Sequence, residues 1–177
     1  MKRHCLNLFL ALAMTAALLT GCGSEAQNTA GTDTIAFETV DMDGNTVTEE
    51  VFTQSKLTMV NVWATYCNPC LSEMPDLGEL AGEYDSADFQ IIGIVSDVME
   101  GADQASLDEA SGLIRDTDAD YTHLLLNESL YYALLTDVSA VPTTFFVDDS
   151  GTVLRSVLGA KEKAVWEELI DELLAEQ

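Results

Sequence analysis

The residues with the clearest chemical potential in this chain are two cysteines, in the sequence Cys67-Asn68-Pro69-Cys70. Two thiols at this spacing can form half of a zinc site, a structural disulfide or a redox pair. A zinc site needs two more ligands, and the mature chain that we expect offers no further cysteine and only His123. A structural disulfide here would close too short a loop to add much stability. The spacing therefore favours a redox pair.

The cysteines stand where a predicted strand gives way to a predicted helix. Lys56–Trp63 is an apolar, β-branched run, as is typical of a buried strand. Apolar residues then recur at helical spacing: Leu71, Met74, Leu77, Leu80 and Tyr84. The free N–H groups and the dipole of a helix N-terminus stabilise a thiolate. Pro69 suits the first turn, where its missing N–H costs nothing.

Strands and helices alternate through the rest of the chain. Asp43-Gly44 predicts a hairpin within Phe37–Val47, and Asp149-Ser150-Gly151 predicts a second one. The other predicted strands are Phe89–Val95, Thr122–Leu126, Thr143–Val147 and Thr152–Val157, and the other predicted helices are Gln104–Asp116, Ser129–Leu135 and Lys161–Ala175. The last helix is expected to turn Val165, Trp166, Leu169, Ile170, Leu173 and Leu174 inward. We predict an α/β fold with a mixed central β-sheet flanked by helices.

The N-terminus predicts a lipoprotein signal peptide over residues 1–21. Lys2 and Arg3 precede the apolar run Leu6–Leu19, which at about 15 residues is shorter than the roughly 20 that span a bilayer. Leu19-Thr20-Gly21-Cys22 resembles the bacterial lipobox, in which cleavage precedes the cysteine and its thiol is lipidated. An uncleaved anchor is the alternative. We expect Cys22 to carry lipid, residues 22–34 to form a flexible tether and residues 35–177 to form one domain.

The chain is strongly acidic. Seven Lys and Arg residues stand against 31 Asp and Glu, which gives a formal net charge of −24. Such a surface repels phosphate groups, so nucleic-acid binding is excluded as a function class. Anionic lipid headgroups repel it too, so contact with a membrane requires an anchor.

The octapeptide Trp63-Ala64-Thr65-Tyr66-Cys67-Asn68-Pro69-Cys70 resembles the active-site signature of thioredoxin-like proteins. The chain is most similar to the TlpA/ResA type of membrane-anchored thiol–disulfide oxidoreductases. The resemblance extends from the Asp43-Gly44 hairpin to Val141-Pro142-Thr143-Thr144-Phe145. It implies a thioredoxin fold with an N-terminal β-hairpin and an inserted helical element within Asp97–Asp120. It also implies that no cofactor or metal is bound.

The resemblance assigns roles to single residues. Cys67, exposed at the helix start, is expected to attack the substrate disulfide, and the more buried Cys70 to resolve the mixed disulfide. Val141-Pro142 matches the cis-proline loop, which turns the backbone of Val141 toward the substrate. A turn at a strand edge is the alternative for Pro142. Trp63 is expected to lie partly in the core and also to line the rim of the site.

One departure from ordinary thioredoxins concerns the acid–base group. Asn61 stands where they carry a buried aspartate, and an amide cannot take the proton of Cys70. Glu73 lies three residues after Cys70, on the same helical face, and resembles the glutamate of TlpA/ResA proteins. We expect apolar surroundings, including Trp63 and Met74, to raise its pKa into a useful range. A solvated surface carboxylate is the alternative.

The resemblance implies a reductase of disulfides in secreted or membrane-associated proteins, of the apocytochrome c or methionine sulfoxide reductase type. It would be a monomer on the outer face of a bacterial cell membrane, supplied by a membrane thiol donor of the CcdA/DsbD type. An oxidase of secreted thiols is the main alternative, and the reduction potential distinguishes the two. A copper-delivery module would space its cysteines by three residues, and a peroxiredoxin would carry Pro and Thr at Val60 and Ala64. His123 is expected to be structural.

Overall fold

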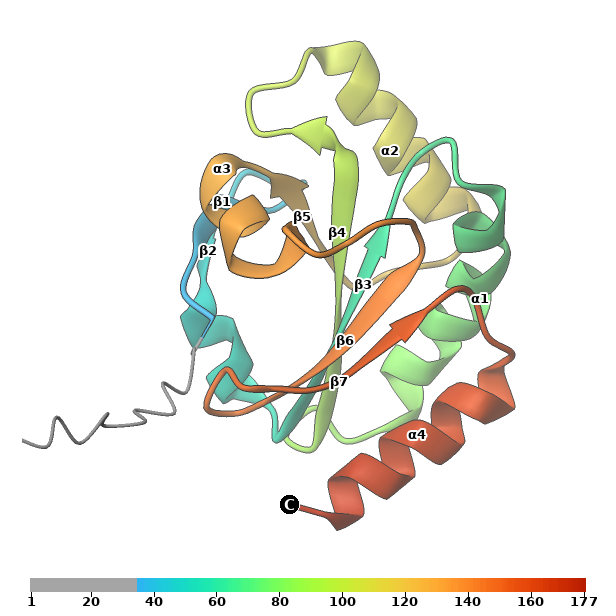
Figure 1. The fold of residues 1–177 in the computed structure, drawn as a ribbon. Coiled ribbons are helices and arrows are strands. Elements are labelled where there is room, and N and C mark those ends of the chain that lie inside the picture. Colours follow the sequence, from blue (N-terminus) through green and yellow to red (C-terminus); the bar gives the residue numbers. More distant parts are fainter. Residues whose placement is uncertain (1–34) are drawn as a thin grey trace, which may run out of the picture. The chain divides into compact units, whose positions relative to one another are not determined.

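The computed structural model describes residues 35–177 (Figure 1). The predicted signal peptide, the lipidated Cys22 and the tether lie outside these residues. Within them, no helix is both long and apolar enough to cross a bilayer.

The centre of the fold is a five-stranded sheet in the order β5-β4-β3-β6-β7. Its strands are β3 (Leu57–Trp63), β4 (Phe89–Met99), β5 (Thr122–Leu126), β6 (Thr143–Asp148) and β7 (Val153–Leu158). Strands β3, β4 and β5 run parallel, whereas β6 and β7 are antiparallel to their neighbours. The predicted mixed sheet is therefore confirmed.

Every residue of β3 is buried, because both faces of the sheet are covered. Figure 1 shows α1 (Asn68–Glu83), α2 (Gln104–Asp116) and α4 (Lys163–Ala175) to the right of the sheet. To its left lie the hairpin of β1 (Glu38–Val40) and β2 (Thr46–Thr48), with α3 (Glu128–Leu130). The short helical turns η1 (Glu49–Gln54) and η2 (Tyr131–Leu135) complete the domain.

The two-residue period of β3 divides its side chains between two cores. Val60 and Val62 join the cluster that includes Phe37, Phe52 and Leu130. Leu57 and Met59 pack instead with residues of α1 and α4: Leu77, Leu80, Trp166, Ile170 and Leu173. By the same alternation, Asn61 and Trp63 lie on the side covered by α1, where Asn61 bonds Glu73 and Trp63 packs with Met74. The strand thus delivers its one amide and its indole to the side of the sheet on which α1 begins.

Three elements differ from the sequence predictions by more than one residue. Strand β4 continues to Met99, with an irregularity between Val95 and Met99, because Val98 is buried and extends the alternation past the polar Ser96 and Asp97. The predicted helix over 129–135 is a single α-turn, α3, followed by the π-turn η2. Helix α4 begins at Lys163, and Val165, expected to face inward, is 39% exposed.

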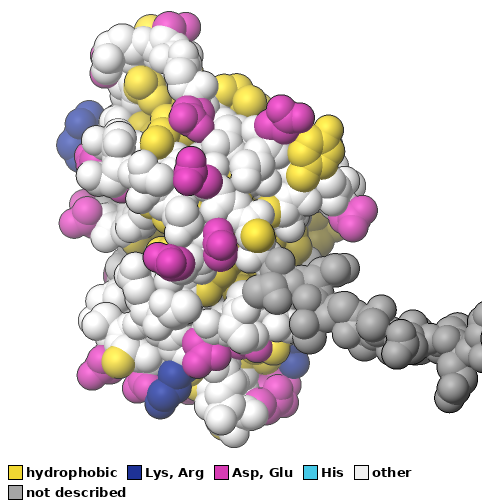
Figure 2. Space-filling model, turned by 90° about the vertical axis from the view of Figure 1, so that its left-hand side faces the viewer, with side chains coloured by type: hydrophobic (Ala, Val, Ile, Leu, Met, Phe, Trp, Pro, Cys, Tyr) yellow, Lys and Arg dark blue, Asp and Glu magenta, His cyan; other side chains and the backbone are white. Residues whose placement is uncertain are grey.

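The predicted N-terminal hairpin and the inserted element are confirmed. Strands β1 and β2 pair antiparallel, and Gly44 has the positive φ of 84° that the turn requires. Helix α2 connects β4 to β5 and packs Ala110 into a cluster with Trp63 and Val95. The charge imbalance is visible on the surface, since Figure 2 shows many carboxylates and few basic side chains over one face.

Candidate active site

The two motif cysteines form a disulfide at the N-terminus of α1. Cys67 is the N-cap residue, and its Sγ accepts a hydrogen bond from the backbone N–H of Cys70 at 3.3 Å. Cys67 is 6% exposed and Cys70 is fully buried. The expectation that Cys67 is exposed is therefore wrong for this disulfide form, although Cys67 remains the more accessible of the two sulfurs.

The cis-proline loop covers Cys67. The Val141–Pro142 peptide bond is cis, as predicted, and the carbonyl oxygen of Val141 lies 3.6 Å from Cys67 Sγ. The loop is anchored at its far end, where Pro142 O accepts from Gly159 N at 2.8 Å. Val141 is half-buried and presents its backbone beside the disulfide.

The segment that leads into Cys67 is held by a residue that the sequence analysis did not single out. Both the N–H and the hydroxyl of Thr65 donate to the carboxylate of Asp97, over 3.1 Å and 2.6 Å. The next residue, Tyr66, is 74% exposed. Asp97 and Thr65 lie 32 residues apart, so no local pattern links them, and only the extension of β4 past Val95 brings them together.

Glu73 lies in the interior, with 3% of its surface exposed. Its Oε1 accepts from Asn61 Nδ2 at 3.1 Å, and its Oε2 accepts from the backbone N–H of Lys161 at 3.1 Å. Burial raises the pKa of Glu73, while the hydrogen bonds from the Lys161 N–H and from Asn61, and the nearby Trp166 indole, oppose that rise. The predicted direction is confirmed and the solvated-carboxylate alternative is wrong. The polar partners, however, come from β3 and from the segment before α4.

Three buried side-chain atoms of the described residues have no hydrogen-bond partner: Asn61 Oδ1, Tyr121 OH and Trp166 Nε1. All three residues are coupled to Glu73. Asn61 donates a hydrogen bond to Glu73, and Trp166 stabilises the charged form of Glu73. The negative charge of Glu73 adds to the burial that raises the pKa of Tyr121. Unpaired buried polar atoms are rare in folded proteins. The surroundings of Glu73 are thus polar but incompletely bonded.

The comparisons with known proteins agree with this geometry. The sequence model of the AhpC/TSA family matches residues 30–156. The chain belongs to this family. It is 32% identical over 123 residues to the thiol:disulfide interchange protein HelX of Rhodobacter capsulatus, a match covering 68% of this chain and 62% of HelX. It is 26% identical over 141 residues to the thiol-disulfide oxidoreductase ResA of Bacillus cereus, covering 80% of this chain and 72% of ResA.

Solved structures place this AhpC/TSA family chain in the thioredoxin fold. A thioredoxin-family thiol:disulfide interchange protein of Chlorobium tepidum superposes with a TM-score of 0.67 at 25% identity, over 80% of this chain and 94% of that one. The exposed lipoprotein thioredoxin Etrx1 of Streptococcus pneumoniae gives a TM-score of 0.62 at 24% identity, over 77% and 98% of the two chains. The predicted fold and the resemblance to thiol–disulfide oxidoreductases are confirmed.

In this family member, Trp63 lies in the core, as predicted in part, but it does not line an exposed rim, contrary to the rest of the prediction. Its side chain is fully buried, because the indole N–H donates to His123 Nδ1 at 3.1 Å inside the domain. His123 Nε2 bonds the carbonyl of Ala119 at 3.0 Å, so the ring carries its proton on Nε2 and accepts at Nδ1. Burial lowers the pKa of His123 to about 4. Any side chain at Gly93 would collide with this ring, which explains the glycine.

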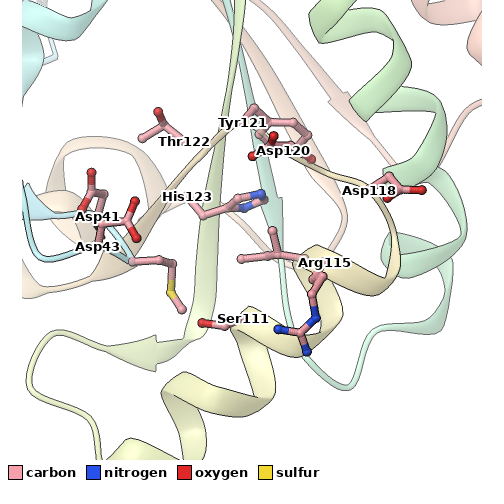
Figure 3. Close-up of a pocket in the computed structure, with 11 residues that line it drawn as sticks. Asp41, Asp43, Ser111, Arg115, Asp118, Asp120, Tyr121, Thr122 and His123 are labelled. Atoms are coloured by element: carbon pink, nitrogen blue, oxygen red, sulfur yellow. Dashed lines mark hydrogen bonds between the residues drawn. The ribbon is translucent and has the colours of Figure 1, made fainter.

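Behind His123 lies a pocket of about 650 Å³ between β5, α2 and the first hairpin (Figure 3). Four of the residues that line the pocket are aspartates, namely Asp41, Asp43, Asp118 and Asp120. Arg115 lines it as well. Within residues 35–177, no three His, Cys, Asp or Glu side chains are grouped to hold a metal ion.

Proposed function

We propose that this protein is a thiol–disulfide oxidoreductase that reduces disulfides of other proteins through Cys67 and Cys70. The observation that carries the proposal is the disulfide at the N-terminus of α1, with the carbonyl of Val141 3.6 Å from Cys67 Sγ. The matches to HelX and ResA support it. Because the match spans only 62% of HelX, the activity, the substrates and the partners of the whole protein belong to this proposal.

In the reduced protein, Cys67 is the attacking thiolate. It is the N-cap of α1, where backbone N–H groups and the helix dipole lower the pKa of a thiol. Attack on a substrate disulfide gives a mixed disulfide through Cys67 and releases the first substrate thiol. Cys70, buried one helical turn further, then attacks Cys67 and releases the second. The backbone of Val141 aligns the substrate as an added strand would.

Glu73 is the group that takes the proton of Cys70 in the second step. It lies one turn along α1 from Cys70 and is a buried carboxyl group with a raised pKa. Asn61, which cannot titrate, holds it at 3.1 Å. A general base is most effective when its pKa lies near the working pH, and burial moves Glu73 in that direction.

The substrates that we propose are disulfides of secreted or membrane-associated proteins, of the apocytochrome c or methionine sulfoxide reductase type. A membrane thiol donor of the CcdA/DsbD type would return the electrons. The lipobox at Cys22 and the apolar run before it support a lipid anchor and an extracytoplasmic location. The names of the relatives HelX, DsbE and ResA fit a role in thiol chemistry of this kind.

The test is the reduction potential of the Cys67–Cys70 pair, measured on the full-length protein in dithiothreitol and glutathione redox buffers. A reductase is expected to have a potential near that of thioredoxin, about −270 mV, whereas a strong oxidase lies near about −120 mV. The reduced protein should then release thiols from a disulfide-bonded polypeptide. A potential close to that of the strong oxidase, with oxidation of added thiols, would reject the reductase in favour of an oxidase.

A further inference from the structure

A second pocket, of about 500 Å³, lies between the first half of α1 and the segment that enters α4. Its walls are formed by Pro69, Ser72, Asp76, Ala160, Lys161, Glu162 and Val165. Glu73 lines it as well, although its side chain is only 3% exposed. The residue that carries the buried carboxyl group therefore forms part of a wall that solvent reaches.

The two carboxyl oxygens of Glu73 face different surroundings. Oε1 accepts from Asn61, whose amide also donates to Thr144 in the sheet. Oε2 accepts from the backbone N–H of Lys161, a residue of the pocket wall. The ammonium group of Lys161 donates to the carbonyls of Leu158 and Gly159 instead of pairing with the carboxylate. One oxygen thus belongs to the core and the other to the pocket.

We propose that this pocket is the route by which Glu73 exchanges its proton with solvent. The inference rests on the proposed function, in which Glu73 takes a proton from Cys70, because the pocket is the path by which that proton leaves. As Cys70 attacks, its proton passes to the Glu73 carboxylate, its sulfur bonds to Cys67, and the substrate sulfur leaves as a thiolate with the electron pair. Protonated Glu73 then releases the proton from the pocket side to water or a buffer base, and solvent supplies one proton to the substrate thiolate.

The groups around Glu73 favour release of its proton to the pocket over release to the interior. Tyr121, just before β5, and Trp166 on α4 are its inner neighbours, and both present buried polar atoms without partners. The phenol of Tyr121 has a raised pKa and does not accept the proton at neutral pH. The charged groups on the pocket wall are Asp76, Lys161 and Glu162. The carboxylates among them can accept a proton and pass it to solvent.

The test is chemical rescue of Glu73→Ala by formate, a carboxylate small enough to enter a pocket of this size. Reduced full-length protein is mixed with a peptide disulfide in a stopped-flow instrument, at constant pH and ionic strength and rising formate concentration. Glu73→Ala is expected to turn over about 100-fold more slowly than wild type, and formate should restore part of the rate. Val165→Trp, which fills the pocket, should remove most of that restoration.

The matched control is Val153→Trp. Val153 on β7 is 41% exposed, close to the 39% of Val165, and does not line the pocket. Formate should rescue Glu73→Ala/Val153→Trp as well as it rescues Glu73→Ala. Equal rescue in the two double variants, or no rescue of a slow Glu73→Ala, overturns the pocket route and leaves the role of Glu73 standing. A wild-type rate in Glu73→Ala rejects that role itself.

The same two tryptophan substitutions are also made with Glu73 intact, in case Glu73→Ala does not fold. Val165→Trp should then slow repeated turnover, measured in dilute buffer with excess dithiothreitol as the reductant, by about tenfold, since Glu73 must lose its proton before it can act as a base again. Raising the imidazole concentration should not restore it, because imidazole is excluded from the filled pocket. Wild-type rates in both variants would overturn the proposal.

Discussion

Asn61 donates a hydrogen bond to Glu73 across 3.1 Å in the core of the domain. The amide comes from the central strand β3 and the carboxyl group from α1, one turn after Cys70. An amide at this place cannot exchange a proton, but it orients a neighbour that can. The acid–base group therefore lies on a helix, and the residue that positions it lies on a strand.

Glu73→Gln tests this division. Glutamine keeps the size of the side chain but cannot take the proton of Cys70, so single-turnover reduction of a peptide disulfide should slow by about 100-fold. The pH dependence between 5 and 9 should lose the step that belongs to Glu73, while alkylation of Cys67 by iodoacetamide stays at the wild-type rate. An unchanged pH profile would contradict the assignment.

The same variant carries a stability signature. The pKa of Glu73 is higher in the folded protein than in the unfolded chain. At a pH between the two values, the folded state therefore binds more protons than the unfolded state does. Wild-type stability should fall across that window relative to Glu73→Gln. Urea unfolding of both proteins at a series of pH values measures the difference, which should grow with pH.

The two cysteines should behave differently when replaced. Cys67→Ala is expected to abolish reduction of the peptide disulfide, because Cys70 is fully buried and cannot reach it. Cys70→Ala should accumulate a mixed disulfide on Cys67, which mass spectrometry of the trapped adduct identifies. Accumulation of the adduct in Cys67→Ala instead would reverse the two roles.

His123 should make the domain sensitive to acid. Its folded pKa is about 4, below the usual 6.5, because burial opposes the charged ring. The unfolded chain therefore binds more protons between pH 6.5 and 4, and stability is lost as pH falls through that window, by about 3 kcal/mol in total. His123→Asn offers Trp63 an acceptor without a titrating group, so its stability should change less over the same range. Parallel curves for the two proteins would count against this explanation.

Asp97 should act on the cysteine pair through Thr65. Asp97→Ala removes the acceptor of the Thr65 N–H and hydroxyl, which should cost about 1 kcal/mol of unfolding free energy and slow the reaction of Cys67. Asp149→Ala is the control, since Asp149 is an exposed residue of the β6–β7 turn. If both variants react at the wild-type rate, Asp97 has no part in holding the segment before Cys67.

Cys22→Ala tests the anchor. Without the thiol of the lipobox the protein should no longer incorporate labelled fatty acid and should be released from the membrane or remain unprocessed. Cys5→Ala is the matched control, because Cys5 lies within the predicted signal peptide and precedes the cleavage site. Retained fatty-acid labelling in Cys22→Ala would reject lipidation at this residue.

The features of this protein that depend on neighbouring residues can be predicted from the amino-acid sequence alone. The apolar run before Cys67 and the helical spacing after it were enough to predict β3 and α1, since strand and helix periodicity are properties of short segments. The redox pair at the start of α1 followed from the same local pattern. The direction of the pKa shift of Glu73 was predicted from the apolar residues expected around it, including Trp63 and Met74.

The groups that surround those residues are known only from the tertiary structure. The partners of Glu73 are Asn61 and Lys161, which lie 12 and 88 residues away, and Trp63 is withdrawn from the surface by His123, 60 residues later. Asp97 reaches Thr65 only because β4 runs past Val95. A hydrogen bond between distant segments depends on sheet order and helix packing, which no local spacing specifies. The fold therefore sets the exposure and the hydrogen-bond partners of each predicted residue.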